Sequence, residues 1–115
     1  FPKRPVLAMM GEAGLDMVIG EMALLDQHKL ALTLVVFRDD TLSLIKLKQE
    51  RMKLPETGVA MGSPDYVMVA EAYGGNGFVV NSVVELKKAA RVALNSKRFT
   101  LIEARINPAE YRQQM

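Results

Sequence analysis

The sequence predicts an α/β fold of three layers, in which a mostly parallel sheet carries helices on both faces. Short apolar runs alternate along the chain with segments of helical periodicity, an order typical of parallel sheets. The first two runs, 5–10 and 30–37, are almost entirely apolar, as expected for strands buried on both faces. Half of the 115 residues are apolar, enough for the core of one small domain, 1–115.

The first half of the chain is predicted to contain two strands and two helices. After the strand at 5–10, the glycines in 11–14 are expected to break the chain. A helix then covers about 18–29, because Ile19, Met22 and Ala23 follow the spacing of one helical face. The strand at 30–37 ends abruptly in charged residues, and a further helix is predicted at 42–52. The stretch 54–62 contains proline and two glycines and indicates a loop.

The second half repeats this alternation. Ser63 and Pro64 predict a helix start, and the apolar stripe of that helix is Tyr66, Val69, Ala70 and Tyr73. Glycines at 74, 75 and 77 end it before a strand at 78–80. Ser82 and Glu85 form a capping box for a helix with a predicted core face of Val83, Leu86, Ala90, Ala93 and Leu94. A last strand is predicted at 100–106, and Asn107-Pro108 begins a short final helix.

Composition excludes several classes of function. The formal charge is only +2, and the basic cluster at 46–53 is interrupted by Glu50 and lacks aromatic residues, so no nucleic-acid interface is expected. The absence of cysteine excludes disulfides and thiolate chemistry. No apolar run reaches the ~20 residues that span a membrane. The opening segment 1–5 does not resemble a signal peptide, which predicts a cytoplasmic location, and Phe1 suggests a piece of a longer protein.

Acidic residues follow the first two strands. Glu12 comes after the first, and Asp39-Asp40 after the second, so adjacent strands would bring these carboxylates to one edge of the sheet, where α/β proteins bind ligands. Oxygen ligands of this kind suit Mg²⁺, while Gly11, Gly14 and the following helix N-terminus would favour a phosphate. By spacing alone, the alternative that these are solvated loop acids stays open.

Two stretches resemble the cofactor motif of thiamine-diphosphate-dependent enzymes. That motif begins Gly-Asp-Gly and ends, 27 residues beyond its Asp, in the second of two Asn. Here the stretch begins GEAGLDMVIGEM and ends VVFRDDTLSLIKLKQ. Gly11, Glu12 and Ala13 fall on the opening triplet, and Arg38 and Asp39 on the two Asn. The later stretches SPDYVMVAEAYGGNGFVVNSVVELKKAARVAL and TLIEARINP are similar to the acetolactate synthase group.

The resemblance implies a partial thiamine-diphosphate-binding fold that lacks its opening segment. It also implies thiamine diphosphate and Mg²⁺ as cofactors, with Glu12, Asp39 and the Thr41 carbonyl as metal ligands. Together with the two loops at the sheet edge, it implies cofactor-binding residues Gly11, Ala13, Gly14, Leu15, Arg38, Leu42 and Ser43. The parent would be a 2-oxo-acid decarboxylase or carboligase and a homo-oligomer. Its partner, an N-terminal pyrimidine-binding domain of the parent or of a partner subunit, would supply the activating glutamate, so the chain alone is expected to be inert.

Four departures from the motif leave a second hypothesis open. Glu12 is one methylene longer than Asp, Ala13 adds a Cβ, Asp39 adds a negative charge and Arg38 a positive one. The arginine could neutralise Glu12 and Asp39 in a metal-free cluster, or donate to a diphosphate oxygen. The first outcome predicts a non-catalytic binding or structural module with a degenerate metal site. A phosphorylatable receiver domain is rejected, because only one acid follows the first strand.

Overall fold

The computed structural model describes residues 3–113 and shows a four-stranded, wholly parallel sheet in the order β1-β2-β4-β3. Its strands are β1 (Val6–Gly11), β2 (Leu32–Arg38), β3 (Asn76–Val80) and β4 (Thr100–Arg105). The helices are α1 (Glu12–Asp16), α2 (Met22–Gln27), α3 (Ser43–Arg51), α4 (Tyr66–Ala72) and α5 (Val83–Asn95), with 3-10 turns η1 (Ile19–Glu21) and η2 (Pro108–Gln113). The predicted α/β architecture is confirmed.

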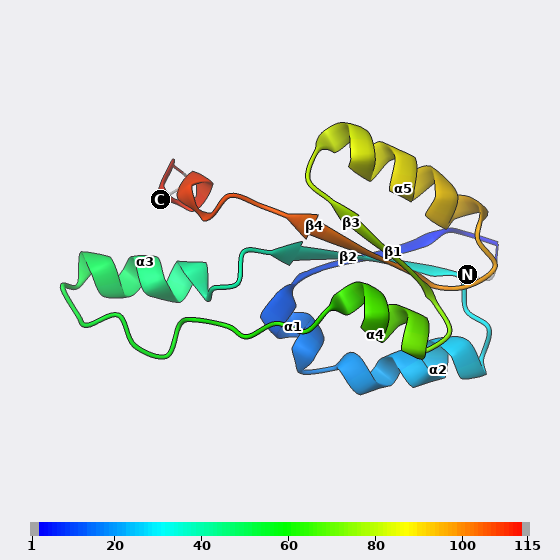
Figure 1. Ribbon diagram of the computed structural model, residues 1–115, viewed down its shortest axis with the longest axis horizontal. Coiled ribbons are helices and arrows are strands. Elements are labelled where there is room, and N and C mark those ends of the chain that lie inside the picture. Colours follow the sequence, from blue (N-terminus) through cyan, green and yellow to red (C-terminus); the bar gives the residue numbers. More distant parts are fainter. Residues whose placement is uncertain (1–2, 114–115) are drawn as a thin grey trace.

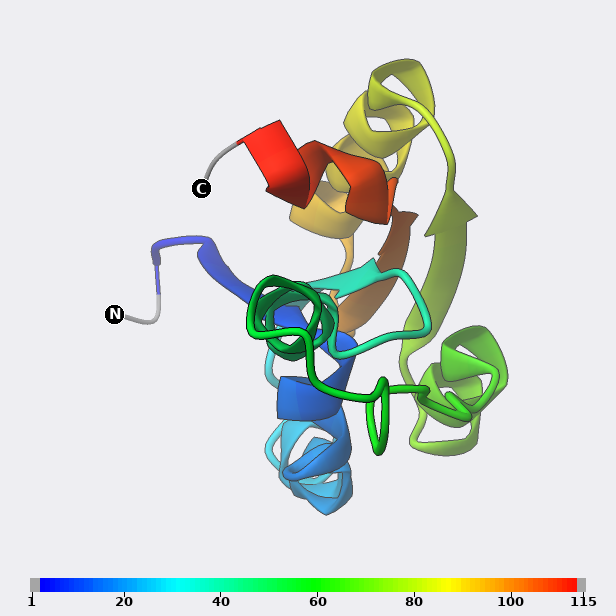
Figure 2. The same ribbon diagram turned by 90° about the vertical axis from the view of Figure 1, so that its left-hand side faces the viewer.

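Helices cover both faces of the sheet (Figure 1). The α1–α2 segment and α4 lie on one face, and α5 lies on the other, as the end-on view of Figure 2 also shows. Side chains of β2 alternate between these layers: Leu34 and Val36 join Tyr66 in one apolar core, whereas Val35 joins Ala89 and Ala93 in the other. Helix α3 extends past the carboxyl ends of the strands.

The first strand is not buried on both faces, contrary to the expectation from its composition. Ala8 and Met10 pack against the core beneath α1 and α4, but Leu7 and Met9 on the opposite face are 58% and 60% exposed. The reason is topological: β1 is an edge strand, and α5 packs against β2, β3 and β4. An apolar run therefore identified a strand correctly without showing which of its faces is covered.

The chain turns into a helix earlier than expected after β1. The predicted break at 11–14 is instead the start of α1, and the predicted helix 18–29 is divided into η1 and α2. Gly14 is tolerated inside α1, since one glycine costs a helix only about 1 kcal/mol, and Leu15 beside it is anchored in the core.

Two helix starts also differ from the pattern in the sequence. Helix α4 is capped by Asp65, whose carboxylate accepts from the Met68 N–H at 3.0 Å, not by Ser63. Ser82 caps α5 as predicted, accepting from the Glu85 N–H, but Glu85 accepts in return from the Asn81 N–H and not from Ser82.

The core face of α5 is narrower than its apolar residues predicted. Ala89 and Ala93 are buried and Leu86 packs beside them, whereas Val83 and Leu94 are 66% and 62% exposed. The sheet surface beneath α5 is crossed by bulky Ile102 and Phe78, and small residues allow the helix to approach it closely.

No helix among residues 3–113 is long and apolar enough to cross a membrane.

We predict that the Gly77→Ala substitution lowers the free energy of unfolding by about 1–3 kcal/mol, the usual effect of overpacking. A Cβ at Gly77 would lie 2.7 Å from the backbone Cα of Val67, so β3 and α4 would have to separate. Gly62→Ala is the matched control, because a Cβ there meets nothing within 4 Å. Chemical denaturation measures both, and equal stability of the two variants would contradict the prediction.

Candidate functional site

The carboxyl ends of β1 and β2 form the base of the candidate site. These strands pair in parallel with Gly11 opposite Phe37, so the next residues of each chain segment leave the sheet side by side. Glu12 opens α1, and Asp39 begins the loop that leads into α3. The sequence argument that these carboxylates share one edge of the sheet depended on this adjacency, which the strand order provides.

The loop after β2 is held in a defined turn. Asp40 adopts a left-handed conformation with φ 57°, which Asp tolerates better than most residues. Its carbonyl accepts from the Met61 N–H at 3.0 Å, and the Leu42 N–H donates to the Val59 carbonyl at 2.8 Å. The segment around Ala60 thus pairs with Thr41 as a short antiparallel bridge and fixes where Asp39 lies.

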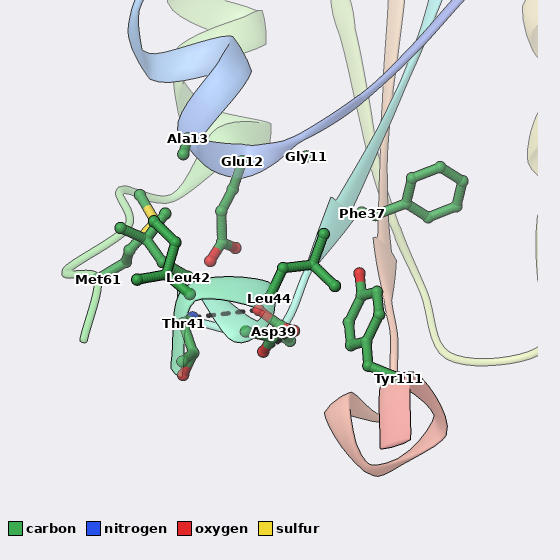
Figure 3. A pocket seen from close by; sticks show the side chains of 12 residues that line it. Gly11, Glu12, Ala13, Phe37, Asp39, Thr41, Leu42, Leu44, Met61 and Tyr111 are labelled. Carbon is green, nitrogen blue, oxygen red and sulfur yellow. Dashed lines mark hydrogen bonds between the residues drawn. The ribbon is translucent and has the colours of Figure 1, made fainter. Parts of the chain in front are cut away.

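A cavity of about 190 Å³ opens between the two loops. Figure 3 shows the Glu12 carboxylate directed towards the loop that carries Asp39 and Thr41, with Ala13 and Leu42 nearby. The lining residues are Gly11, Glu12, Ala13, Phe37, Asp39, Thr41, Leu42, Ser43, Leu44, Ile45, Met61 and Tyr111. Most of the wall is apolar, and the acidic groups among the lining residues are Glu12 and Asp39.

Glu12 is the most unusual group of the site. It is only 3% exposed, and neither carboxylate oxygen has a hydrogen-bond partner. Burial raises its pKa, the nearby charges of Asp39 and Asp40 raise it further, and Arg38 and the polar backbone of Thr41 partly counteract them. A buried carboxylate without a donor is strongly unfavourable, so this position favours a proton or a cation.

Asp39 is held by neutral donors. The Thr41 N–H donates to Oδ1 at 3.1 Å, and the Ser43 hydroxyl donates to Oδ2 at 2.5 Å. The carbonyl of Thr41 accepts from the Ser43 N–H at 2.9 Å. A carbonyl oxygen has two lone pairs, so one remains available for a further donor or a cation. These contacts orient the carboxylate of Asp39 without neutralising its charge.

Arg38 points away from this cavity. Consecutive residues of a strand project to opposite faces, so Arg38 lies on the face of Val36 and stacks over the Tyr66 ring at 5.7 Å. It donates to Asp40 at 2.8 Å, to buried Glu103 at 3.1 Å and to the carbonyls of residues 63 and 64. The salt bridge to Glu12 and Asp39 that was one expectation for Arg38 is not formed.

The structure gathers most, but not all, of the expected site residues. Gly11, Glu12, Ala13, Asp39, Thr41, Leu42 and Ser43 line the cavity. Gly14 and Leu15 do not line it: Leu15 is a core side chain, and a Cβ at Gly14 would meet Met10. The reason is helical geometry, because α1 begins at Glu12 and its third and fourth residues rotate away from the cavity.

Sequence reasoning missed five lining residues, the apolar Phe37, Leu44, Ile45 and Met61 and the polar Tyr111. Tyr111 is the one with an ionisable group. It belongs to η2, which the chain brings back over the carboxyl end of the sheet. Burial raises the pKa of its phenol, and the charges of Asp39 and Glu12 raise it further. No signal in the sequence identified it, because Tyr111 reaches the cavity only through the pairing of β2 with β4, which brings the segment after β4 to the same edge.

The residues present fit a divalent cation together with a diphosphate. No group of three or more His, Cys, Asp or Glu side chains among residues 3–113 could hold a metal by itself. Mg²⁺, however, is commonly bound by one or two carboxylates and completed by waters and phosphate oxygens. The partnerless oxygens of Glu12, the oriented carboxylate of Asp39 and the Thr41 carbonyl are such a partial set.

The chain as a whole matches a known family. Residues 1–104 match the family of the C-terminal TPP-binding domain of thiamine pyrophosphate enzymes. Thiamine pyrophosphate (TPP) is another name for thiamine diphosphate. The chain belongs to this family. The resemblance noted from the motif is therefore confirmed, as is thiamine diphosphate as the cofactor that such domains bind.

Individual relatives agree with this assignment. The domain is 27% identical over 105 residues to a Bacillus subtilis protein described as thiamine pyrophosphate-containing, covering 91% of this chain and 18% of the relative. It is 22% identical over 116 residues to an acetolactate synthase large subunit of Buchnera aphidicola, covering 96% and 20%. The domain thus spans about a fifth of the length of these relatives.

Solved structures share its fold. A thiamine diphosphate-dependent 4-hydroxybenzoylformate decarboxylase of Rhodococcus jostii superposes with a TM-score of 0.85 at 24% identity, covering 92% of the domain and 20% of that chain. A benzoylformate decarboxylase from Polynucleobacter necessarius gives a TM-score of 0.83 at 27% identity, covering 91% and 20%.

We predict that Glu12→Gln stabilises the domain at neutral pH in EDTA by about 1–2 kcal/mol, because it removes a buried charge that has no partner. The raised pKa of Glu12 means that the folded chain binds this proton more tightly than the unfolded chain. The contribution of Glu12 to stability is thus fully present below its ordinary value of 4.5 and is lost as pH rises through the folded value.

Denaturation curves between pH 4 and pH 8 measure this difference, which should shrink towards pH 4. Glu56→Gln is the control, since Glu56 is exposed and pairs with Lys46 at the surface. If Glu12→Gln were no more stable than the unsubstituted domain at pH 8, Glu12 would not be an uncompensated charge.

Proposed function

We propose that this domain binds the diphosphate of thiamine diphosphate through a divalent cation, as part of a 2-oxo-acid decarboxylase or carboligase. The observation that carries the proposal is Glu12, a buried carboxylate with two partnerless oxygens directed into a cavity that also holds Asp39. A structural carboxylate at this depth would be paired or hydrogen-bonded. A cation bridging both carboxylates to a diphosphate removes the penalty.

The proposed metal ligands are Glu12, Asp39 and the Thr41 carbonyl, with Mg²⁺ as the ion. Most of the cavity lining is apolar, which lowers the local polarity around an ion and strengthens its attraction for carboxylates and phosphates. Glu12 reaches the site from a helix start, and its additional methylene relative to Asp places the carboxylate farther from the backbone of α1.

The proposed diphosphate contacts come from both loops. Gly11, Ala13, Leu42 and Ser43 line the cavity beside the metal ligands. Arg38 was expected here, but its N–H groups are engaged by Asp40, Glu103 and two carbonyls. Its part in this proposal is to hold the turn at Asp40, which in turn sets the position of Asp39.

The class of reaction is proposed from the chemistry of the cofactor and from the relatives. When bound, thiamine diphosphate supplies a nucleophilic carbon that adds to carbonyl substrates and stabilises the resulting carbanion. Named relatives include an acetolactate synthase and two decarboxylases of aryl 2-oxo acids. A 2-oxo acid is therefore the proposed substrate class of the parent protein.

A non-catalytic module with a degenerate site is the second candidate. Ala13 supports it, because its Cβ lines the cavity where the motif has glycine. The argument from Arg38 is weaker than the sequence suggested, since this arginine does not neutralise Glu12 and Asp39. The uncompensated charge of these two acids favours a working cation site.

We predict that thiamine diphosphate titrated calorimetrically into the 115-residue chain binds in Mg²⁺ and not in EDTA. Glu12→Gln should abolish the Mg²⁺-dependent heat, because an amide oxygen carries no charge for the ion. Glu56→Gln, at an exposed residue that does not line the cavity, should bind like the unsubstituted chain. Absence of binding in Mg²⁺ by a chain shown to be folded by circular dichroism would favour the degenerate module.

We also predict that the 115-residue chain alone neither decarboxylates nor ligates pyruvate. Its candidate site contributes groups for the cation and the diphosphate, and we infer that a pyrimidine-binding domain of the parent or of a partner subunit in a homo-oligomer activates the cofactor. Release of CO₂ from labelled pyruvate is the measurement. If the unsubstituted chain released CO₂ and the Glu12→Gln variant did not, activation by a separate pyrimidine-binding domain would not be required.

A further inference from the structure

Basic residues gather at the amino end of the sheet, opposite the candidate site. The four segments that lead into the strands are 3–5, 28–31, 73–75 and 96–99. None of them contains Asp or Glu, and together they carry Lys3, Arg4, His28, Lys29, Lys97 and Arg98. The small formal charge of the chain therefore conceals a separation of charge along the strands, with a basic end and an acidic end.

A cleft of about 980 Å³ opens at this basic end. Three segments form it: the start of β1, the turn between α2 and β2, and the last turn of α5, which lie at the same end of the sheet in Figure 1. Within residues 3–113, its lining contains the cations Lys3, Arg4 and Lys29, and neither an acidic nor an aromatic side chain. The volume lies at the upper end of the range for small-molecule pockets, about 300–1,000 Å³.

The rest of the lining is largely apolar. Val6, Leu30 and Leu94 border the cleft with exposed side chains, while Leu32 and Ala93 continue its floor towards the two cores. Leu94 was predicted on the core face of α5, and it borders this cleft instead. Exposed apolar side chains that are rimmed by charged groups are typical of ligand-binding surfaces.

Lys29 lies on the turn between α2 and β2. The Leu30 N–H closes this turn by donating to the Leu25 carbonyl at 2.9 Å, and Lys29 adopts a left-handed conformation with φ 51°. Glycine is the usual residue at such a helix end, so the lysine is held in an unfavourable backbone conformation, a feature that clusters at ligand sites. Its ammonium pairs with Asp26 at 2.8 Å, but both side chains are exposed and the pair contributes little. An ammonium has three N–H donors, so Lys29 can also donate to a bound anion.

We propose that this cleft binds a single anionic amphiphile, an alkyl chain that ends in a carboxylate or a phosphate. The alkyl chain packs against Val6, Leu30 and Leu94, which removes apolar surface from water. The head group lies at the rim beside Lys3 and Lys29, where it accepts charge-assisted hydrogen bonds. A nucleotide would find no aromatic side chain among these lining residues on which its base could stack. The site lies at the opposite end of the sheet from the cofactor cavity and does not depend on the proposed function.

The test is an NMR chemical-shift titration of the isotope-labelled 115-residue chain with hexanoate, octanoate and decanoate, each below its micelle concentration. We expect the amide signals of Leu30 and Leu94 to shift. Affinity should rise with chain length by up to about fourfold per added methylene, the value for complete burial. Lys29→Gln and Leu94→Ser should each weaken decanoate binding at least about threefold, because one removes a positive charge and the other removes apolar surface.

Two controls on α5 match these variants. Lys88→Gln and Val84→Ser change the same kinds of side chain at exposed positions that do not line the cleft, so their decanoate affinity should equal that of the unsubstituted chain. Decyltrimethylammonium carries a similar alkyl chain with a cationic head, and it should bind at least about tenfold more weakly than decanoate, because the rim repels it. Thermal melts verify that all four variants are folded.

The outcomes decide both the site and the ligand. Length-dependent decanoate binding that Lys29→Gln and Leu94→Ser weaken, and that the two controls leave unchanged, would support the proposal. Equal affinity for decanoate and decyltrimethylammonium would overturn it, as would undiminished decanoate binding by Lys29→Gln and Leu94→Ser. Binding to phosphatidylglycerol vesicles by a chain that does not bind monomeric decanoate would also overturn it, because the basic end would then recognise a membrane surface.

Discussion

The parallel pairing of β1 with β2 is the constraint on which the candidate site depends. It sets Gly11 opposite Phe37, so that Glu12 and Asp39 leave the sheet at neighbouring points although they lie 27 positions apart in the chain. A shift of this register by one residue would turn the side chains of β2 to the opposite faces. Leu34 and Val36 oppose that shift, because both are buried in the core beneath α4.

Arg38 connects this core to the loop that carries Asp39. It joins β2 to β4 through buried Glu103, reaches the carbonyls before α4, and holds Asp40 in its left-handed turn. A half-buried arginine with several acceptors is a structural group more than a surface ion pair, since losing its contact with Glu103 would leave a buried carboxylate less well paired. Arg38, whose position in the family motif suggested a cofactor contact, therefore shapes the loop that carries Asp39.

Glu12 places stability and binding in opposition. Its burial without a partner destabilises the empty domain, yet the same burial makes the cavity attractive to a cation. Sites prepared for a ligand commonly carry such an unfavourable arrangement, which the ligand relieves. A cation bound to the folded chain alone also stabilises it by mass action, so domain stability and cofactor loading are expected to be coupled.

Much of the fold could be read from local patterns. The four strands, α3, α5 and the alternation of strands with helices follow from periodicity and from caps such as Ser82. The family motif identified Glu12, Asp39 and Thr41, which do line one cavity.

What local pattern could not show was which surfaces of the elements pack against one another. Leu7 and Met9 are exposed because α5 lies over other strands. Arg38 lies on the face of Val36 because strand residues alternate between faces, whereas Asp39 begins the loop after β2. Tyr111 arrives from the end of another strand. Each depends on contacts between segments distant in sequence, which no local spacing encodes.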